Sequence, residues 1–100
     1  MERSQVEEAA KILHTAWYKK TTINELPRSC RPKNMKEGYE IQSALIDMHG
    51  TKVAGYKIGA TNRVAQEMFN VNAPFFGRVM APSIKKSPAR IPEGLLVLYI

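Results

Sequence analysis

The spacing of the apolar residues changes near Gly50, and this change most constrains how the chain can fold. Before Gly50, apolar residues recur at three- and four-residue steps over residues 3–20 and again over residues 35–49, which predicts two amphipathic helices. After it, residues 52–60 read as a short strand and a turn, and the side chains of a strand alternate between two faces. We therefore expect an α/β chain of the α+β kind, in which two helices precede the first strands.

Local residue patterns predict where these helices begin and end. Asn34 followed by Glu37 has the spacing of a capping box, and Gly50 can end the second helix in the left-handed conformation. Ser4 followed by Glu7 predicts a similar start for the first helix. The expected organisation is thus a helical region followed, after Gly50, by a region built on strands.

The segment after the predicted strand contains shorter elements. Thr61 is the expected N-cap of a short third helix over residues 62–69, whose inward-facing residues should be Val64, Ala65, Met68 and Phe69. The sequence NVNAPFFG then predicts a turn-rich loop that carries two adjacent aromatic residues, and Arg78–Ala81 predicts a second short strand. The region 51–100 should therefore contain strands joined by a small helix.

Lys57 is the residue of the first strand that invites a chemical interpretation. Strand alternation places Lys57 on one face with Gly55 and Gly59, and glycines leave space above a strand for a ligand or another backbone. A lysine in such a space can hold a carboxylate or pass a proton. The strand pattern equally fits an edge strand whose lysine faces water and discourages pairing with other sheets.

The positive charge of the chain is scattered. The formal net charge is +6, and residues 51–100 carry seven Lys and Arg against two acids, Glu67 and Glu93. A nucleic-acid interface would gather basic residues on one face beside aromatic or polar residues. We therefore expect no nucleic-acid partner, although a basic binding module remains a weaker hypothesis.

Composition predicts a cytoplasmic protein without a membrane partner. No apolar run approaches the about eighteen residues that a membrane helix needs, and the start MERSQVEEAA lacks the apolar core of a signal peptide. The single cysteine, Cys30, has no partner for an internal disulfide and no second ligand at metal-binding spacing. A reducing compartment fits this cysteine content best.

Three motifs at their combined spacing resemble a known enzyme family. VAGYKIGATN, followed by QEMFNV and PFFGRV, resembles the 2-keto-4-pentenoate hydratase and 4-oxalocrotonate decarboxylase family, within the fumarylacetoacetase-like superfamily. The upstream GYEIQ, residues 38–42, resembles a helix of the same family. The matching residues of the three motifs are Gly55, Tyr56, Lys57, Ile58, Gly59, Gln66, Val71, Pro74, Phe76 and Gly77.

Two positions depart from the family pattern. Ala60-Thr61-Asn62 replaces the commoner Leu-Thr-Ser, and Asn70 stands where the family often has Gly. These departures bear on fine substrate specificity more than on membership.

The resemblance implies a fold, a reaction and a set of site residues. It implies that residues 51–100 form the first part of a fumarylacetoacetase-like core after a helical region at residues 1–50. Family members hold Mg²⁺ or Mn²⁺ through a Glu-x-Glu pair and a further acid, and the metal stabilises enolate charge on a short unsaturated keto acid. By similarity, Lys57 is the proton shuttle or carboxylate partner, Thr61 and Phe76 line the pocket, and Gly59 leaves it open. A homo-oligomer is also implied.

The last residues limit this expectation. The apolar ending LLVLYI resembles the family strand that comes just before the Glu-x-Glu pair, so we expect an incomplete core and no metal ligand in this chain. Glu93 lies in a Pro-Glu-Gly turn, which is ordinary loop chemistry. The expected parent activity is hydration of a 2-hydroxy-2,4-dienoate in the breakdown of aromatic compounds. The alternatives are decarboxylation of a related oxo acid, or a non-catalytic fragment or accessory subunit whose partner supplies the acids; the chain alone should be inactive.

Overall fold

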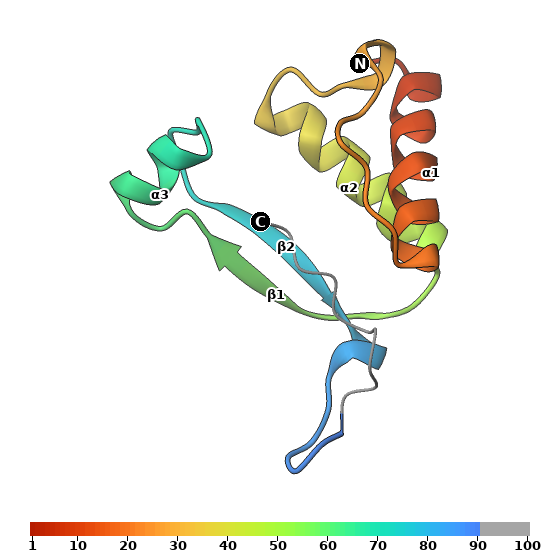
Figure 1. Cartoon of the computed structure of the whole chain (residues 1–100), viewed down its shortest axis with the longest axis vertical. Coiled ribbons are helices and arrows are strands. Elements are labelled where there is room, and N and C mark those ends of the chain that lie inside the picture. Colours follow the sequence, from red (N-terminus) through yellow and green to blue (C-terminus); the bar gives the residue numbers. More distant parts are fainter. Residues whose placement is uncertain (91–100) are drawn as a thin grey trace. The chain divides into compact units, whose positions relative to one another are not determined.

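Helices and a small sheet occur together in this chain. The computed structural model describes residues 1–90 (Figure 1), so the apolar segment at residues 95–100 and Glu93 lie outside the described residues. In chain order the elements are α1 (Arg3–Lys19), the 3₁₀ turn η1 (Arg28–Cys30), α2 (Met35–His49), β1 (Val53–Gly59), α3 (Arg63–Met68), β2 (Phe75–Met80) and the 3₁₀ turn η2 (Ala81–Ser83). The chain is thus of the mixed α and β class that the sequence predicts. One compact unit is built on Met1–Gly50 and another on Thr51–Ser87.

The predicted N-cap and C-cap residues of α2 are confirmed, although Glu37 accepts the Lys33 backbone N–H and so does not complete the capping box with Asn34. The Asn34 Oδ1 atom accepts a hydrogen bond from the Glu37 backbone N–H at 2.9 Å. At the other end, Gly50 adopts a φ of 74°, the left-handed conformation that glycine takes without steric cost. Local sequence signals alone therefore define both ends of this helix.

The predicted capping box at Ser4 and Glu7 is wrong. Helix α1 begins two residues earlier than that box requires, with Glu2 as the N-cap, and the Glu2 backbone N–H donates to Gln5 Oε1 at 3.0 Å. Glu7 instead accepts a hydrogen bond from the Arg3 Nε at 2.8 Å, one helical turn away. Because Glu2 is the N-cap, Ser4 becomes an ordinary first-turn residue.

Helices α1 and α2 run side by side in the same direction. At their N-terminal ends, the Met1 ammonium lies 3.2 Å from Glu37 Oε2. At their C-terminal ends, the Trp17 and His49 rings are stacked, with centroids 4.0 Å apart and 9° between their planes. The connection over residues 20–34, here called the return segment, must therefore travel back along the helices before α2 can begin (Figure 1).

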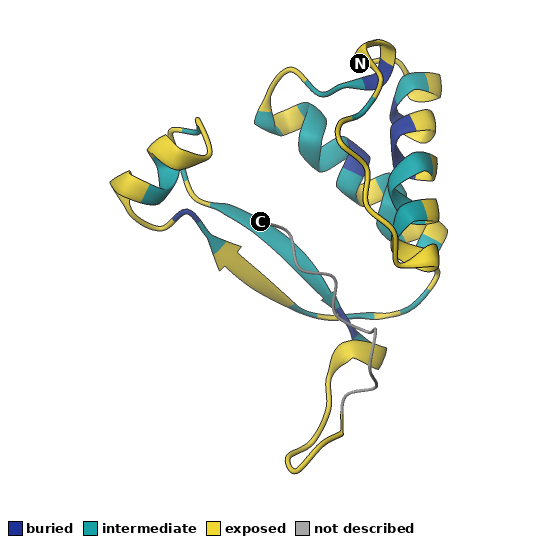
Figure 2. Cartoon of the chain, viewed as in Figure 1, coloured by how far each residue is buried: buried dark blue, intermediate teal, exposed yellow. Residues whose placement is uncertain are grey.

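The core of this unit forms where the return segment meets both helices. Its buried members come from α1, from η1 and from α2 (Figure 2), and they are Val6, Ala9, Ala10, Cys30 and Ile41. Alanines on α1 let the neighbouring backbone approach closely, and full burial of a side chain such as Ile41 contributes about 1.5–3 kcal/mol. Burial also raises the pKa of the Cys30 thiol, so this cysteine is a packing residue.

The second unit is an antiparallel pair of strands with α3 in the connection between them. Lys57 pairs with Gly77 and Gly59 with Phe75, and a β-bulge lies between Val53 and Gly55. The buried hydrophobic residues of this unit, among those described, are Ala60 and Met80.

Three expectations for this unit need correction. Asn62, not Thr61, caps α3, because its Oδ1 accepts the Ala65 backbone N–H at 2.8 Å. Phe75 and Phe76 lie in β2, since the strand begins three residues before the predicted Arg78. The α3 residues predicted to face inward are largely exposed, because a six-residue helix beside two strands has little to pack against; Val64 is 71% and Met68 74% exposed.

No helix within residues 1–90 combines the length and apolar character that a membrane-spanning helix requires.

The carboxylate of Glu37 makes the first unit sensitive to acid. Its pKa lies below the usual range, because it accepts the Lys33 backbone N–H at 2.8 Å and lies beside the Met1 ammonium. A carboxyl with a lowered folded-state pKa contributes stability above its unfolded pKa, and this stability is lost as the pH falls through the folded value. The unfolding free energy, measured by urea titration, should fall between about pH 7 and about pH 3. We predict that this fall is smaller in Glu37→Gln than in the original chain.

Glu40→Gln is the matched control, because Glu40 lies on the same helix and has no ion pair among residues 1–90. This control should retain the acid sensitivity of the original chain. An equal reduction in both variants would show that the contacts of Glu37 do not cause the effect.

Candidate functional site

Lys57 extends across the strand pair and over Gly77. The two residues are directly opposite in the register, and a Cβ atom built on Gly77 would lie 3.2 Å from Lys57 Cε and 3.6 Å from Lys57 Cγ. The lysine stem therefore occupies the space that a side chain at position 77 would fill. Glycine at 77 determines the path of the lysine, a contact that the sequence analysis did not foresee.

Gly59 does not leave open space, in contrast to the expectation. It pairs with Phe75 across the strands, and a Cβ atom on Gly59 would lie only 2.8 Å from Phe75 Cε1. The phenyl ring covers the glycine backbone, as aromatic residues often do across an antiparallel pair. Gly55 does meet the expectation, since nothing lies within 4 Å of its Cβ position.

The structure separates Phe76 and Thr61 from the side chain of Lys57. Phe76 pairs with Ile58, so its side chain points to the face opposite Lys57, where its ring contacts Tyr56 at a centroid distance of 5.7 Å. Thr61 is exposed in the connection before α3. Phe75 is the aromatic residue on the Lys57 face, and only knowledge of the strand register could have identified it.

A shallow hollow of about 250 Å³ lies beside Lys57. Lys57, Gly59, Phe75 and Gly77 contribute to it from one face, and Ile58 and Phe76 complete its border. Among residues 1–90, no carboxylate lies within ion-pair distance of the Lys57 ammonium. The hollow thus combines apolar walls with one cation that is available to an anionic ligand.

The Gln66 side chain holds the turn that follows β1. Ala60 has a φ of 54°, a left-handed conformation that is unfavourable for a residue with a Cβ atom. The Gln66 side chain donates from Nε2 to the Ala60 carbonyl at 3.0 Å and so fixes this turn from within α3. Asn70 also has a φ of 54°, and asparagine tolerates this conformation better than most residues.

The described residues do not form a metal site. Within residues 1–90 no three His, Cys, Asp or Glu side chains come together as a group that could hold an ion. The residues described therefore do not supply the ligands that the Mg²⁺ or Mn²⁺ implied by the resemblance would need.

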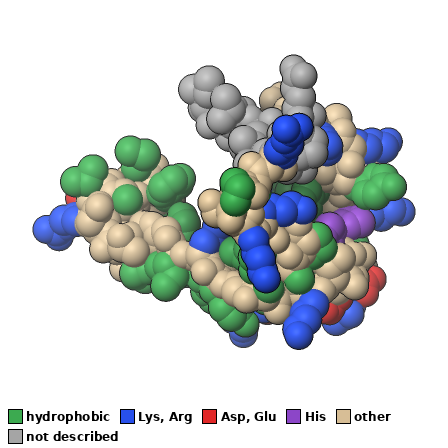
Figure 3. All heavy atoms as spheres, turned by 90° about the horizontal axis from the view of Figure 1, so that it is seen from below, with side chains coloured by type: hydrophobic (Ala, Val, Ile, Leu, Met, Phe, Trp, Pro, Cys, Tyr) green, Lys and Arg blue, Asp and Glu red, His purple; other side chains and the backbone are tan. Residues whose placement is uncertain are grey.

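The second unit also exposes apolar side chains. Hydrophobic side chains gather on its surface (Figure 3), and the exposed ones include Tyr56, Ile58, Val64, Met68 and Phe69. A two-stranded sheet has only marginal stability by itself. Cross-strand contacts such as Lys57 over Gly77 therefore matter more here than a buried core.

Comparisons with protein families, with curated proteins and with solved structures find no match for this chain.

The Gln66 contact yields a stability prediction for the second unit. Gln66→Leu removes a partly buried hydrogen bond to the Ala60 carbonyl, and we expect the unit to lose about 1 kcal/mol of stability. Amide hydrogen exchange of the β1 and β2 residues measures this loss. Glu67→Leu is the control, because Glu67 is exposed and its ion pair with Arg63, the one it makes within residues 1–90, is long at 3.9 Å. Similar exchange rates in the two variants would contradict the bracing role of Gln66.

Proposed function

We propose that this chain supplies the lysine-bearing part of a hydratase that adds water to a 2-hydroxy-2,4-dienoate. The observation that carries the proposal is the position of Lys57, which lies over Gly77 at the edge of the apolar hollow and has no carboxylate partner among residues 1–90. A short unsaturated keto acid has one anionic end and an apolar chain. Both parts find a complementary group at this hollow.

Under this proposal Lys57 binds the substrate carboxylate or handles a proton. Hydration of a dienoate requires a proton to move along the conjugated chain before water adds. A lysine at the border of the hollow can donate that proton as an ammonium, and the neutral amine that remains can take a proton back. Phe75, rather than Phe76, forms the aromatic wall on the lysine face. The resemblance implies that Gly59 leaves the pocket open. In this proposal Gly77 does so instead, because the absence of a side chain at position 77 lets the lysine cross the strands.

The wider architecture belongs to the same proposal. A fumarylacetoacetase-like core, built around β1, α3 and β2 and assembled as a homo-oligomer, would cover the apolar side chains that the second unit exposes. The acidic ligands for Mg²⁺ or Mn²⁺ would come from outside residues 1–90. The same lysine and hollow would serve a decarboxylase of the family equally, and an accessory subunit would use them only together with a partner that supplies the acids.

Substitution of Lys57 tests its role in turnover. In the protein that carries the complete set of metal ligands, Lys57→Met should lower turnover of the dienoate by about a hundredfold or more, because it removes the cation and keeps the stem. Lys52→Met is the control, since Lys52 is also exposed and lies just before β1. Turnover within about twofold of the original protein in both variants would return Lys57 to the role of a surface lysine.

The 100-residue chain by itself should be inactive. We expect no loss of dienoate absorbance above a protein-free blank when the chain is mixed with Mg²⁺ and substrate, because residues 1–90 offer no group of metal ligands. Measurable Mg²⁺-dependent turnover would show that the chain assembles a metal site after all. A coding sequence that continues past Ile100 with a Glu-x-Glu pair would favour the enzyme, whereas a stop codon would favour the accessory subunit.

A further inference from the structure

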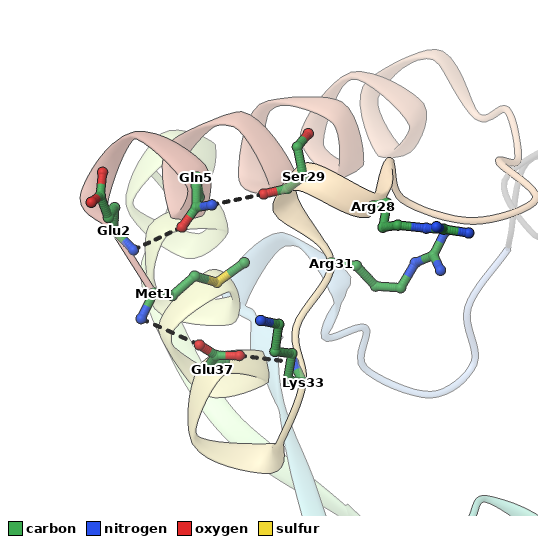
Figure 4. Close-up of a pocket in the computed structure, with 8 residues that line it drawn as sticks. All are labelled: Met1, Glu2, Gln5, Arg28, Ser29, Arg31, Lys33 and Glu37. Carbon is green, nitrogen blue, oxygen red and sulfur yellow. Dashed lines mark hydrogen bonds and ion pairs between the residues drawn. The ribbon is translucent and has the colours of Figure 1, made fainter.

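A polar pocket in the first unit lies far in sequence from the candidate hydratase residues. It has a volume of about 510 Å³ and is formed at the start of α1, at η1 and its flanking residues, and at the start of α2 (Figure 4). Its charged and amide side chains are Glu2, Gln5, Arg28, Arg31, Lys33 and Glu37. The pocket uses no residue of Thr51–Ser87, so what it binds is independent of the function proposed above.

On one side of the pocket, the polar side chains of Gln5 and Glu37 already have partners within the protein. Glu37 accepts the Lys33 backbone N–H at 2.8 Å through Oε1 and lies 3.2 Å from the Met1 ammonium through Oε2. Gln5 accepts the Glu2 backbone N–H at 3.0 Å and donates to the Ser29 carbonyl at 2.9 Å. These contacts shape the wall, and the two lining acids, Glu2 and Glu37, lie on the side away from the guanidinium groups (Figure 4). Glu25, which does not line the pocket, lies beside Arg31.

The 3₁₀ turn explains why two arginines share the other side of the pocket. In a 3₁₀ helix, side chains three residues apart lie above one another, and Arg28, the first residue of η1, and Arg31, its C-cap, have this spacing. Figure 4 shows both side chains extending away from Glu37. The fold therefore directs two positive charges to the same part of the pocket.

Contacts with the return segment hold Arg31 in place. Its Nε and Nη2 atoms donate to the Leu26 carbonyl at 3.2 and 2.9 Å, and Nη2 lies 3.2 Å from Glu25 Oε1. Arg28 has no carboxylate within ion-pair distance among residues 1–90. One guanidinium is thus already oriented, and the other is available to an anion.

We propose that this pocket binds the phosphate group of a small phosphate monoester between Arg28 and Arg31. A phosphate monoester carries between one and two negative charges at neutral pH, and its oxygens match the planar fork of arginine donors. Lys33 adds a third positive charge to the lining. The volume of about 510 Å³ exceeds what a bare phosphate fills, so the pocket has room for a group attached to the phosphate.

Titration of the chain with glycerol 3-phosphate and with inorganic phosphate tests the proposal. Amide signals of Ser29, Arg31 and Lys33 should shift saturably in two-dimensional NMR spectra, and glycerol 3-phosphate should bind more tightly than inorganic phosphate. Arg28→Gln should weaken the monoester about tenfold, because a charge-assisted pair of hydrogen bonds is lost. Arg28 makes no ion pair in the fold described, so this variant should remain folded, as its spectrum would confirm.

Lys36→Gln is the matched control. Lys36 lies on α2 beside Glu37, is exposed and does not line the pocket, yet its substitution removes the same charge. Binding should stay within about twofold of the original chain. The proposal is overturned by shifts that do not saturate, by equal weakening in Arg28→Gln and Lys36→Gln, by monoester binding no tighter than inorganic phosphate, or by tighter binding of malonate than of either phosphate.

Discussion

Two neighbouring helices that run in the same direction need a connection about as long as the helices themselves. Helix α1 has 17 residues and spans about 25 Å at the standard rise of about 1.5 Å per residue. The return segment covers this distance in an extended course, and the rest of the first unit depends on how it is held. Cys30 anchors it in the core, and Gln5 and Arg31 fix its backbone by hydrogen bonds. The polar pocket is a direct product of this connection.

The second unit is stabilised in a different way from the first. It buries little apolar surface among the described residues, and its strands are held by side chains that lie across glycines on the partner strand. Phe75 covers Gly59 and Lys57 covers Gly77, in opposite directions across the same pair of strands. Gly59 and Gly77 are therefore each covered by one large side chain from the partner strand. Lys57 thus helps to hold the strands together as well as presenting its ammonium group.

Sequence patterns could predict the features that depend on a few neighbouring residues. The spacing of apolar residues located both long helices, and the cap at Asn34 and the left-handed Gly50 followed from residue types alone. The box at Ser4 was wrong because Glu2 and Gln5 form the capping box two residues earlier. Local patterns fail where two neighbouring positions can both begin the helix.

The candidate site depended on strand pairing, which the sequence does not encode locally. Lys57 was singled out correctly as a residue of β1, but the partner over which it lies is set by a register between residues twenty positions apart. Reading Phe75 and Phe76 as a loop gave no way to assign their faces, and a shift of one residue moves a side chain to the other face of the sheet. The role of Gln66 was likewise hidden, because it concerns the carbonyl of Ala60 and not a side chain.

The stacking of Trp17 on His49 gives the chain an intrinsic optical probe. Trp17 is the only tryptophan of the sequence, and it lies in the first unit, where its ring meets the end of the partner helix. Its fluorescence therefore reports whether the C-terminal ends of α1 and α2 are together. The two units can thus be distinguished spectroscopically without any added dye, by comparing tryptophan emission with a probe of the backbone as a whole.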